Sequence, residues 1–482
     1  MKSLDIVASR GRKILFFNPD ENVITMIQRR ADSVTETLTD NTVMSDLFGP
    51  IKNALAKVRF SDKIFQSLSM ESFMLFAAIR QFTQNASLRE HVQQLWHCEP
   101  SASRVPLARS TWSDALSSST RRIIVRQCVA RLVSAAREAL PNKLAGVQGL
   151  GSRPVLAIDA TYQKESSHFQ RVLPKEGGSD NQKGHMLMTA YDIRHGIPVC
   201  VRTEAASIGE MSVLKMMGED KQDWTRIRNA IYVVDRAFID GQYWEDRQTE
   251  VEASVITRMK ATLNYTQKAI RPLSESACNE NVINDYEIEL QSGKLPWRLV
   301  EWRSPEGEFY QYLTNDFSLE PGVVAFLYYR RWDVEKYFDN FKHDLVNAKA
   351  WGKSACAIEL QALLGLMTYV LTMLFLLRRK DDLAMPDGDM TQSKKHARKM
   401  ALYLQREDIE HENEECDDDA CDIESGEKNI SDYIYPDAYR AFYTQLSRIT
   451  RQIWRFLKYS FRHKSSQTLY ERQLKPLLMK YL

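Results

Sequence analysis

The sequence predicts an α/β protein with mostly helical segments before and after its sheet-forming part. Apolar residues recur at helical spacing through the first 142 residues. From Gly151 the chain changes to short β-rich runs bounded by Gly, Pro and polar clusters, and after residue 320 helical periodicity returns. The 482 residues, 44% of them hydrophobic, are enough for a substantial core divided among several structural units.

The first part, residues 1–145, is expected to be a helical DNA-binding region. Helical spacing is clear in "ESFMLFAAIRQFTQ" and "RRIIVRQCVARLVSAAREAL". Between these segments, a turn containing Pro and Ser joins two short expected helices, either as a helix-turn-helix or as an ordinary helical hairpin. In a helix-turn-helix, Arg109, Ser110, Thr111 and Trp112 would open the second helix toward DNA.

The middle of the chain is expected to form one α/β domain with a β-rich insertion. Residues 150–262 contain the runs "RPVLAIDATY", "KGHMLMTAYDI", "IPVCVRTE", "AIYVVDRAF" and "EASVITRMKA", which we predict to be strands of one sheet. Residues 263–320 alternate in "YEIEL", "WRLVEWRS" and "EFYQYLTND" around a "PEGE" turn, which predicts an antiparallel insertion. The domain then continues through residues 321–380.

The uncharged run from Ala362 to Leu377 is predicted to be a buried core helix and not a membrane span. A helix of these residues extends about 24 Å, which is less than the roughly 30 Å hydrocarbon core of a bilayer. Charges interrupt the start, "MKSLDIVASRGRKILFF", where a secretory signal needs an apolar stretch. The seven scattered cysteines include no CxxC pair, which fits a reducing compartment. We therefore expect a cytoplasmic protein that does not bind membranes.

Charge is distributed unevenly along the chain, although the formal net charge is only +2. Residues 407–427 contain twelve Asp or Glu and no Lys or Arg. Without them, 65 basic residues stand against 51 acidic ones (63 less 12), a net charge of +14. A basic body favours a polyanionic partner. The last region, residues 381–482, is expected to combine this acidic linker with C-terminal helices.

Asp159 and Asp235 each end a buried apolar run, in "VLAIDATY" and "IYVVDRAF". Side chains at the carboxyl ends of neighbouring strands converge on the crevice where α/β sheets place ligand sites. We therefore expect these two carboxylates to meet, although a single Asp at such a position is more often a turn or cap residue.

The segment "YYRRWDVEKYFDNFKHDL", from Tyr328 to Leu345, is predicted to be one helix with a polar and an apolar face. At about 100° per residue, Tyr328, Arg331, Glu335 and Lys342 fall within one stripe of about 60°. Taken alone, this stripe also fits a solvated face with i,i+4 ion pairs. The adjacent face, expected to pack on the sheet, comprises Leu327, Val334, Tyr337, Phe338, Phe341 and Leu345.

Three carboxylates, Asp159, Asp235 and Glu335, suit a pair of Mg²⁺ or Mn²⁺ ions, because these ions prefer hard oxygen ligands and leave positions for water and phosphate. Two such ions can activate a water and stabilise the leaving oxygen of a phosphodiester. Arg331 and Lys342 are predicted to bind backbone phosphates beside them.

The stripe has the spacing Y-x2-R-x3-E-x6-K, which resembles the signature around the catalytic Glu of DDE transposases of the insertion-sequence-four type. "IDATY" and "VVDRAFID" resemble that family's two Asp motifs, and "VITRMKA" resembles the strand after the second. The resemblance covers about Val155 to Leu377. It implies an RNase H-like core with a β-rich insertion before the Glu-bearing helix, and a DNA transposase that cleaves transposon ends and joins them to target DNA.

The resemblance also implies roles for single residues and partners. Asp159, Asp235 and Glu335 would be the catalytic and metal-binding triad, acting on double-stranded DNA in a homodimer associated with the nucleoid. Excision through a hairpin would place a flipped base on an aromatic of the insertion, either Trp297 or Trp302. The DNA-contacting residues implied in this way are Tyr328, Arg331, Lys342, Thr161, Arg236, Arg258, Lys260 and Trp302.

Two other functions use the same residues. One is a DNA-binding regulator that descends from a transposase and no longer catalyses, although all three triad carboxylates are present. The other is an RNase H-like nuclease that cuts DNA without joining it. Detection of joined target products separates the transposase from this nuclease.

Overall fold

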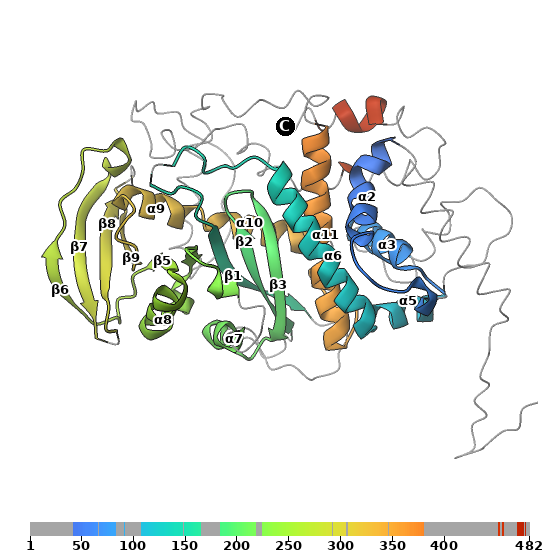
Figure 1. Cartoon of the computed structure of the whole chain (residues 1–482), viewed down its shortest axis with the longest axis horizontal. Helices are drawn as coiled ribbons and strands as arrows, with labels where there is room; N and C mark the ends of the chain where they lie inside the picture. Colours follow the sequence, from blue (N-terminus) through green and yellow to red (C-terminus); the bar gives the residue numbers. More distant parts are fainter. Residues whose placement is uncertain are drawn as a thin grey trace, which may run out of the picture.

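The computed structural model describes residues 42–379, apart from 66, 83–90, 92–107, 148, 165–183, 218–223, 292, 305–306 and 346, together with 452–453, 456, 470–476 and 478. The acidic segment 407–427, most of the C-terminal helices and most of the first helix of the expected helix-turn-helix lie outside these residues. In Figure 1 the outer strands occupy one end of the molecule and the N-terminal helices the other.

One mixed sheet of nine strands runs through the molecule in the order β3-β2-β1-β4-β5-β9-β8-β7-β6. The apolar runs of β1, β4 and β5 pair in parallel, whereas β2 and β3 pair antiparallel beside β1. All five strands predicted in this part of the sequence are confirmed. They are β1 (Val155–Lys164), β2 (Gly184–Asp192), β3 (Ile197–Ala205), β4 (Ile231–Val234) and β5 (Ser254–Arg258).

The predicted antiparallel insertion is also present, and it extends the core sheet. Its last strand pairs antiparallel with β5, with Ile256 opposite Thr314. The first strand, β6, was not predicted, because every residue in it is exposed and no apolar alternation marks it. The insertion strands are β6 (Tyr265–Ile270), β7 (Val282–Leu290), β8 (Pro296–Arg303) and β9 (Phe309–Thr314).

The prediction of one helix from residue 328 to 345 is wrong. The segment forms the end of α9 (Pro321–Tyr329), then α10 (Trp332–Asp339) and a π-helical segment, η5 (Asn340–Asp344). In an α-helix each amide donates to the carbonyl four residues earlier. Here the Arg331 amide donates to Tyr328, three residues earlier, and the Leu345 amide donates to Asn340, five residues earlier. Such switches arise from tertiary contacts, which helical periodicity does not report.

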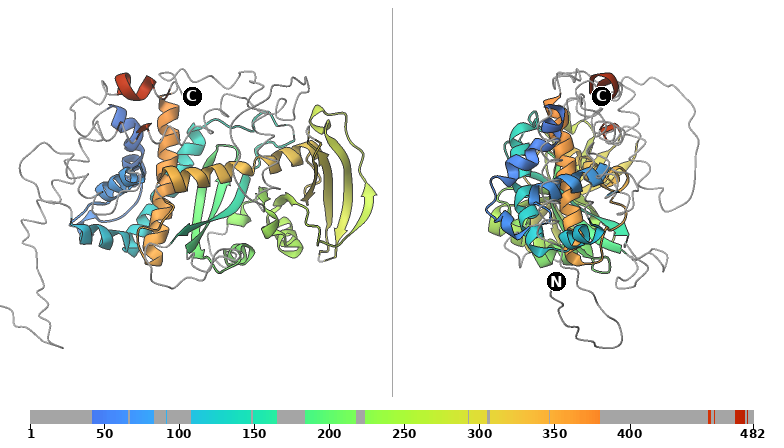
Figure 2. Two further views of the ribbon diagram at one scale, coloured as in Figure 1. Left: turned by 180° about the vertical axis from the view of Figure 1, so that it is seen from behind. Right: turned by 90° about the vertical axis from the view of Figure 1, so that its right-hand side faces the viewer.

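These helices lie across one face of the sheet. α9 contacts β5, β8 and β9, and α10 contacts β1; Figure 2 shows α10 crossing the core strands from behind. The predicted apolar face is confirmed, because all six of its residues are buried. Tyr337 packs edge-on against Tyr369, with ring centroids 5.0 Å apart, and also contacts Tyr191. The apolar face therefore positions the polar stripe over the sheet.

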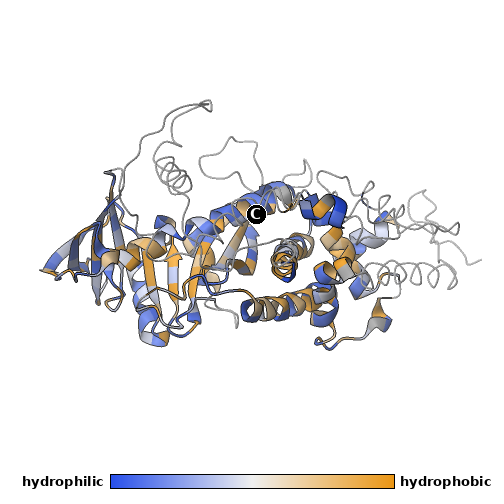
Figure 3. Ribbon diagram, turned by 90° about the horizontal axis from the view of Figure 1, so that it is seen from above, coloured by the Kyte–Doolittle hydropathy of each residue, from blue (hydrophilic) through white to orange (hydrophobic). Residues whose placement is uncertain are grey.

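The prediction of a core helix at Ala362 to Leu377 is confirmed, but its length argument was wrong. The helix, α11 (Ala355–Arg378), has 24 residues and is long and apolar enough to cross a membrane, yet 94% of its apolar window is buried inside the protein. Figure 3 shows it nearly end-on among other helices. It packs on β3 and on helices from the first part of the chain, namely α2 (Thr42–Leu55), α3 (Met70–Phe82), α5 (Arg109–Leu116) and α6 (Ser119–Ala139).

The remaining described helical elements are short. The two α-helices are α7 (Glu210–Met217) and α8 (Gly241–Val251). The turns are η1 (Asp62–Ile64), η2 (Trp224–Arg226), η3 (Arg236–Phe238), η4 (Ala277–Asn279) and η6 (Tyr470–Leu474).

Gly322→Ala is expected to lower the melting temperature of the full chain. A methyl carbon at Gly322 would lie 1.6 Å from the carbonyl oxygen of Cys278, so η4 or α9 must move. Overpacking costs about 1–3 kcal/mol, more than the roughly 1 kcal/mol that Ala gains over Gly in a helix. Gly146→Ala is the control, because nothing lies within 4 Å of a methyl there. Equal calorimetric melting temperatures for Gly322→Ala and wild type would contradict this close approach.

Candidate active site

The two aspartates predicted to meet lie on neighbouring strands. Ile158 of β1 is opposite Val234 of β4 in parallel register, so Asp159 and Asp235 are each the next residue along. Asp235 ends its strand as predicted and precedes η3. Asp159 does not end β1, which continues to Lys164 and pairs with β2 over that length. Asp159 instead marks the level at which β4 stops.

Arg331 joins two of the three predicted catalytic carboxylates. Its Nη1 atom lies 3.0 Å from Oδ2 of Asp159 and 2.6 Å from Oε1 of Glu335. The Arg331 side chain is only 6% exposed, and those of Asp159 and Glu335 are 14% and 30% exposed. Bonds between ionised partners in such a partly dry site are stronger than surface ion pairs. Arg331 therefore holds α10 against β1 at Asp159.

Tyr328 connects this ion-pair cluster to the insertion. The guanidinium of Arg331 lies 5.5 Å from the centre of the Tyr328 ring, and that ring is 5.1 Å from the ring of Tyr312 on β9. Tyr312 stacks on Tyr310 at 6.3 Å, and Tyr310 contacts Trp302 of β8 at 5.8 Å. The row of rings Tyr328, Tyr312, Tyr310 and Trp302 thus leads from the insertion to Arg331.

Two members of this row were missed in the sequence. Tyr310 and Tyr312 are two positions apart in "EFYQYLTND", so they share a face of β9. That alternation was the available signal. The predicted residue Arg258 joins the row, since its guanidinium lies 5.0 Å from the Tyr310 ring centre.

The two tryptophans considered for base stacking have different surroundings. Trp297 is buried, and its indole N–H donates to Glu245 at 3.1 Å, so it fastens β8 to α8. Trp302 is 7% exposed and lies on the sheet face that leads to Tyr328. Of the pair, Trp302 is the one that belongs to the row of rings ending at Arg331.

The other predicted contact residues lie in or just after elements of the core. Thr161 is buried in β1, two residues beyond Asp159. The remaining residues are half-buried: Arg236 begins η3, Lys260 follows β5 and Lys342 lies in η5.

The predicted second helix is confirmed, but it occurs in a helix-turn-helix and in a helical hairpin alike, so the helix-turn-helix stays a prediction. α5 begins at Arg109 as predicted, and Arg109 and Ser110 are exposed. Trp112 does not face outward. It is fully buried, with ring centroids 5.4 Å from Phe73 and 5.3 Å from His91. Trp112 therefore anchors α5 in the helical core.

The three predicted carboxylates are of the kind that binds a hard divalent ion, but they do not converge on one point. In the described part of the chain, no three His, Cys, Asp or Glu side chains are arranged to hold a metal ion. Asp159 and Glu335 nevertheless face one cationic group, the Arg331 guanidinium, and Asp235 lies beside Asp159 in the next strand. Carboxylate oxygens are the ligands that Mg²⁺ and Mn²⁺ take. By donor chemistry, the residues present therefore suit such an ion.

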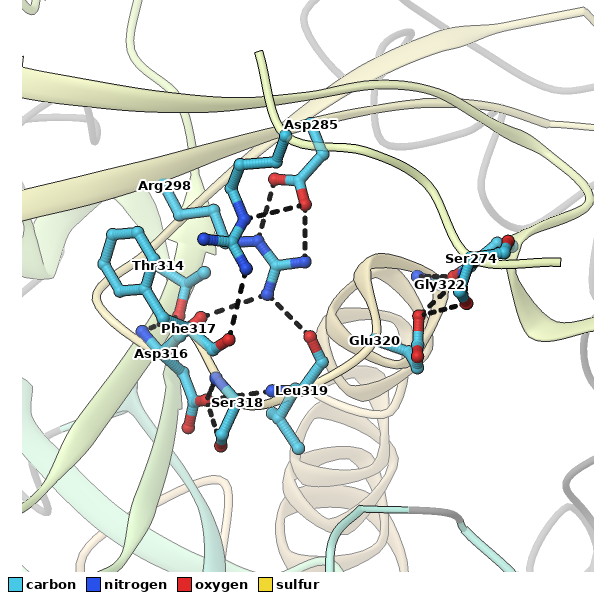
Figure 4. Close-up of polar contacts among 12 residues, drawn as sticks. Ser274, Asp285, Arg298, Thr314, Asp316, Phe317, Ser318, Leu319, Glu320 and Gly322 are labelled. Atoms are coloured by element: carbon cyan, nitrogen blue, oxygen red, sulfur yellow. Dashed lines mark hydrogen bonds and ion pairs between the residues drawn. The ribbon is translucent and has the colours of Figure 1, made fainter. Parts of the chain in front are cut away.

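A buried ion pair in the insertion positions the start of α9. Arg298 of β8 makes two bonds to Asp285 of β7, at 2.8 and 2.7 Å, and both side chains are 2% exposed. Figure 4 shows the same guanidinium bonding the carbonyls of Asp316, at 3.1 Å, and Leu319, at 2.6 Å. Arg271 reaches Asp285 from the other side at 3.3 Å. Because α9 begins at residue 321, this Arg298 cluster sets the direction of the helix that carries Tyr328.

Further contacts hold the same turn. Asp316 forms an ion pair with Arg153 at 2.6 Å and accepts bonds from the backbone amides of Ser318 and Leu319. Burial alone would raise the pKa of Asp316, but the Arg153 charge and the Ser318 bonds outweigh it, so the pKa lies below its ordinary value. Asn279 accepts a bond from the Gly322 amide at 2.9 Å. Residues of both the insertion and the core thus hold the turn before α9 and the first turn of this helix.

Buried charges also lie behind α10. Arg330 pairs with Asp333 through a short contact, and both side chains are buried. Burial lowers the pKa of Lys143 well below its ordinary value, with the charge of Asp333 opposing this shift. The inner side of α10 therefore depends on buried polar groups as well as on its apolar face.

Comparison with known proteins supports the DDE transposase part of the resemblance and does not test the insertion-sequence-four type. Residues 150–371 match the family model described as "Transposase DDE domain". Among solved structures, the chain is similar to a piggyBac transposase in a synaptic complex with hairpin DNA, at 11% identity over 79% of this chain and 82% of that one, with a TM-score of 0.37. A likeness at that score does not establish a shared fold. The search of curated proteins gives no match.

Arg298→Met is expected to destabilise the chain by about 3–5 kcal/mol, because Asp285 keeps its burial and loses its bidentate partner. Arg271→Met removes the other arginine from the same carboxylate and is the matched control. Arg271 is 30% exposed and bonds Asp285 at only 3.3 Å, so its loss should cost about 0–1 kcal/mol. Urea unfolding followed by tryptophan fluorescence compares the two variants. Equal losses of stability would contradict the role given to Arg298.

Proposed function

We propose that this protein is a DDE transposase, which cleaves DNA at transposon ends and joins those ends to target DNA. The observation that carries the proposal is the convergence of Asp159 and Glu335 on Arg331. Asp159 and Glu335 are 176 positions apart in the sequence. With Arg331, they fall within the segment that matches the Transposase DDE domain. The described sheet, with Asp235 in register beside Asp159, supports the same assignment.

The catalytic core in this proposal is RNase H-like and comprises β1 to β5 with α9, α10 and α11. Asp159, Asp235 and Glu335 would hold two Mg²⁺ or Mn²⁺ ions. When bound, such ions activate a nucleophilic water or hydroxyl and stabilise the leaving oxygen of a phosphodiester. The low exposure of Arg331 and Asp159 supports a site from which most bulk water is excluded.

The chain's own basic and aromatic residues would bind and orient the DNA. Lys342 and Arg331 would hold backbone phosphates next to the carboxylates, with the Tyr328 ring 5.5 Å from the Arg331 guanidinium. The Arg258 guanidinium lies over the Tyr310 ring of the insertion. From there it would contact the same DNA strand as Arg331 and Lys342. Thr161, Arg236 and Lys260 complete the proposed DNA-contacting set.

Excision in this proposal follows the cut-and-paste route with a hairpin intermediate. A base turned out of the duplex would stack on Trp302. The position of Trp302 on the row of rings supports this choice, since Trp297 is engaged with Glu245. Because Trp302 is 7% exposed, a neighbouring side chain would have to move to admit the base.

The proposed partners are two transposon ends and a target duplex, bound by a homodimer associated with the nucleoid in the cytoplasm. The net charge of +14 outside residues 407–427 supports a polyanionic partner. The exposed start of α5, at Arg109 and Ser110, is the proposed DNA-facing part of the N-terminal region.

Glu335→Gln is expected to lower cleavage by about 10²–10³-fold, as is typical for loss of a group that stabilises charge in the transition state. The assay incubates the purified full chain with a plasmid carrying its gene's native flanking DNA and Mg²⁺ or Mn²⁺, and it measures excised and joined products on gels. Glu252→Gln is the control, because Glu252 is exposed and its side chain forms a surface ion pair with Arg228.

Each outcome of this assay selects one function. Metal-dependent joining that is lost in Glu335→Gln and retained in Glu252→Gln supports the transposase. Cleavage without joined products indicates a nuclease of the same fold. Full activity in Glu335→Gln would refute the proposed site, and DNA binding without any cleavage by the wild type would indicate a regulator.

A further inference from the structure

Arg331 lies where a metal ion would be expected to bind. A single atom, Nη1, bonds one oxygen of Asp159 and one oxygen of Glu335 at 3.0 and 2.6 Å. A divalent cation shared by these two carboxylates would also lie between them and bind their oxygens. The guanidinium is buried, with 6% of the side chain exposed, so it is a built part of the site and not a surface ion pair.

Arg331 and a divalent ion cannot occupy this position together. Two like charges a few ångströms apart repel strongly where water is scarce. The ion would also compete with Arg331 for the negative charge of both carboxylates. Binding of the ion therefore requires Arg331 to leave both carboxylates, and the released guanidinium, which stays positively charged, needs another anion close by.

We propose that Arg331 is a positioning residue that occupies the metal position in the free protein and couples metal binding to DNA binding. It holds Asp159 and Glu335 together until an ion replaces it, and it then moves to a DNA phosphate. This inference rests on the proposed function, since it assumes that the two carboxylates bind metal. It adds that the free protein binds metal weakly and that DNA strengthens the binding.

The coupling is reciprocal. A phosphate that accepts Arg331 lowers the cost of removing it from the carboxylates, so DNA raises the affinity for metal. By linkage, metal raises the affinity for DNA by the same factor. In the free protein the guanidinium lies 5.5 Å from the Tyr328 ring. The ring face attracts a cation, so it favours positions of Arg331 that stay close to Tyr328. The consequence is a site that assembles fully only on DNA.

The test is a titration of Mn²⁺ into the full-length, DNA-free protein, followed by electron paramagnetic resonance of the unbound ion. Arg331→Met is expected to bind Mn²⁺ about tenfold more tightly than wild type, within the usual range of coupled binding. Arg122→Met is the matched control, because Arg122 also pairs with a carboxylate, Glu359 at 3.0 Å, but on α6 and α11. It should leave Mn²⁺ binding unchanged. Glu335→Gln identifies the site, because it should weaken binding in both the wild-type and the Arg331→Met background.

A second titration adds DNA, and its wild-type comparison does not depend on how a variant folds. Mn²⁺ affinity is measured with and without a duplex oligonucleotide of about 20 base pairs, since phosphate contacts do not require a particular sequence. The duplex should raise Mn²⁺ affinity in wild type and raise it less in Arg331→Met. Arg331→Lys, which keeps the charge on a single amine, should lie between the two.

The outcomes separate this inference from the proposed function. If Glu335→Gln weakens Mn²⁺ binding but Arg331→Met binds no more tightly than wild type, the metal site stands and the inference is overturned. An unchanged Mn²⁺ affinity of the wild type upon addition of duplex also overturns it. If Glu335→Gln has no effect on Mn²⁺ binding in any background, the proposed metal centre itself is wrong.

Discussion

The contact on which the candidate site depends is the one between Arg331 and two carboxylates. Asp159 comes from a central strand and Glu335 from a helix that crosses the sheet, and one guanidinium nitrogen bonds both. Two carboxylates at this separation would repel each other without a cation between them. Arg331 supplies that positive charge, so it determines how α10 docks on β1. The break between α9 and α10 falls at this same residue.

The insertion supports this contact from a distance. Arg298 bonds Asp285 within the insertion and two carbonyls in the turn before α9, so the direction of α9 follows the position of the outer strands. At its other end, α9 presents Tyr328 to Tyr312 and to Arg331. The nine-stranded sheet makes this connection stiff, because β9 pairs directly with β5 of the core. The insertion is therefore a structural part of the site as well as a surface beside it.

Much of this arrangement could be predicted from local sequence. The five core strands each contain an apolar run bounded by turn residues, and each was found. The stripe of Arg331 and Glu335 was also found, because residues four apart on a helix face the same way. Strand β6 was missed, since an exposed edge strand carries no apolar alternation.

The contact between Arg331 and Asp159 could not be predicted from spacing, because it joins residues 172 positions apart. The phosphate-binding role predicted for Arg331 did not include its bond to the carboxylates. The change from α-helical to π-helical bonding near Asn340 also depends on tertiary packing. Gly365 of α11 lies so close to Phe341 that an added methyl would be 2.4 Å from that ring. Local propensity contains no information about such a neighbour.

The most direct test of the account is a crystal structure of the full chain before and after soaking with Mn²⁺, with anomalous scattering used to locate the ion. The account predicts that Arg331 bonds Asp159 and Glu335 in the untreated crystal. After soaking, an anomalous peak should lie between these two carboxylates, with Arg331 displaced from both. A peak bound elsewhere, or an Arg331 that keeps both bonds beside a bound ion, would contradict the account.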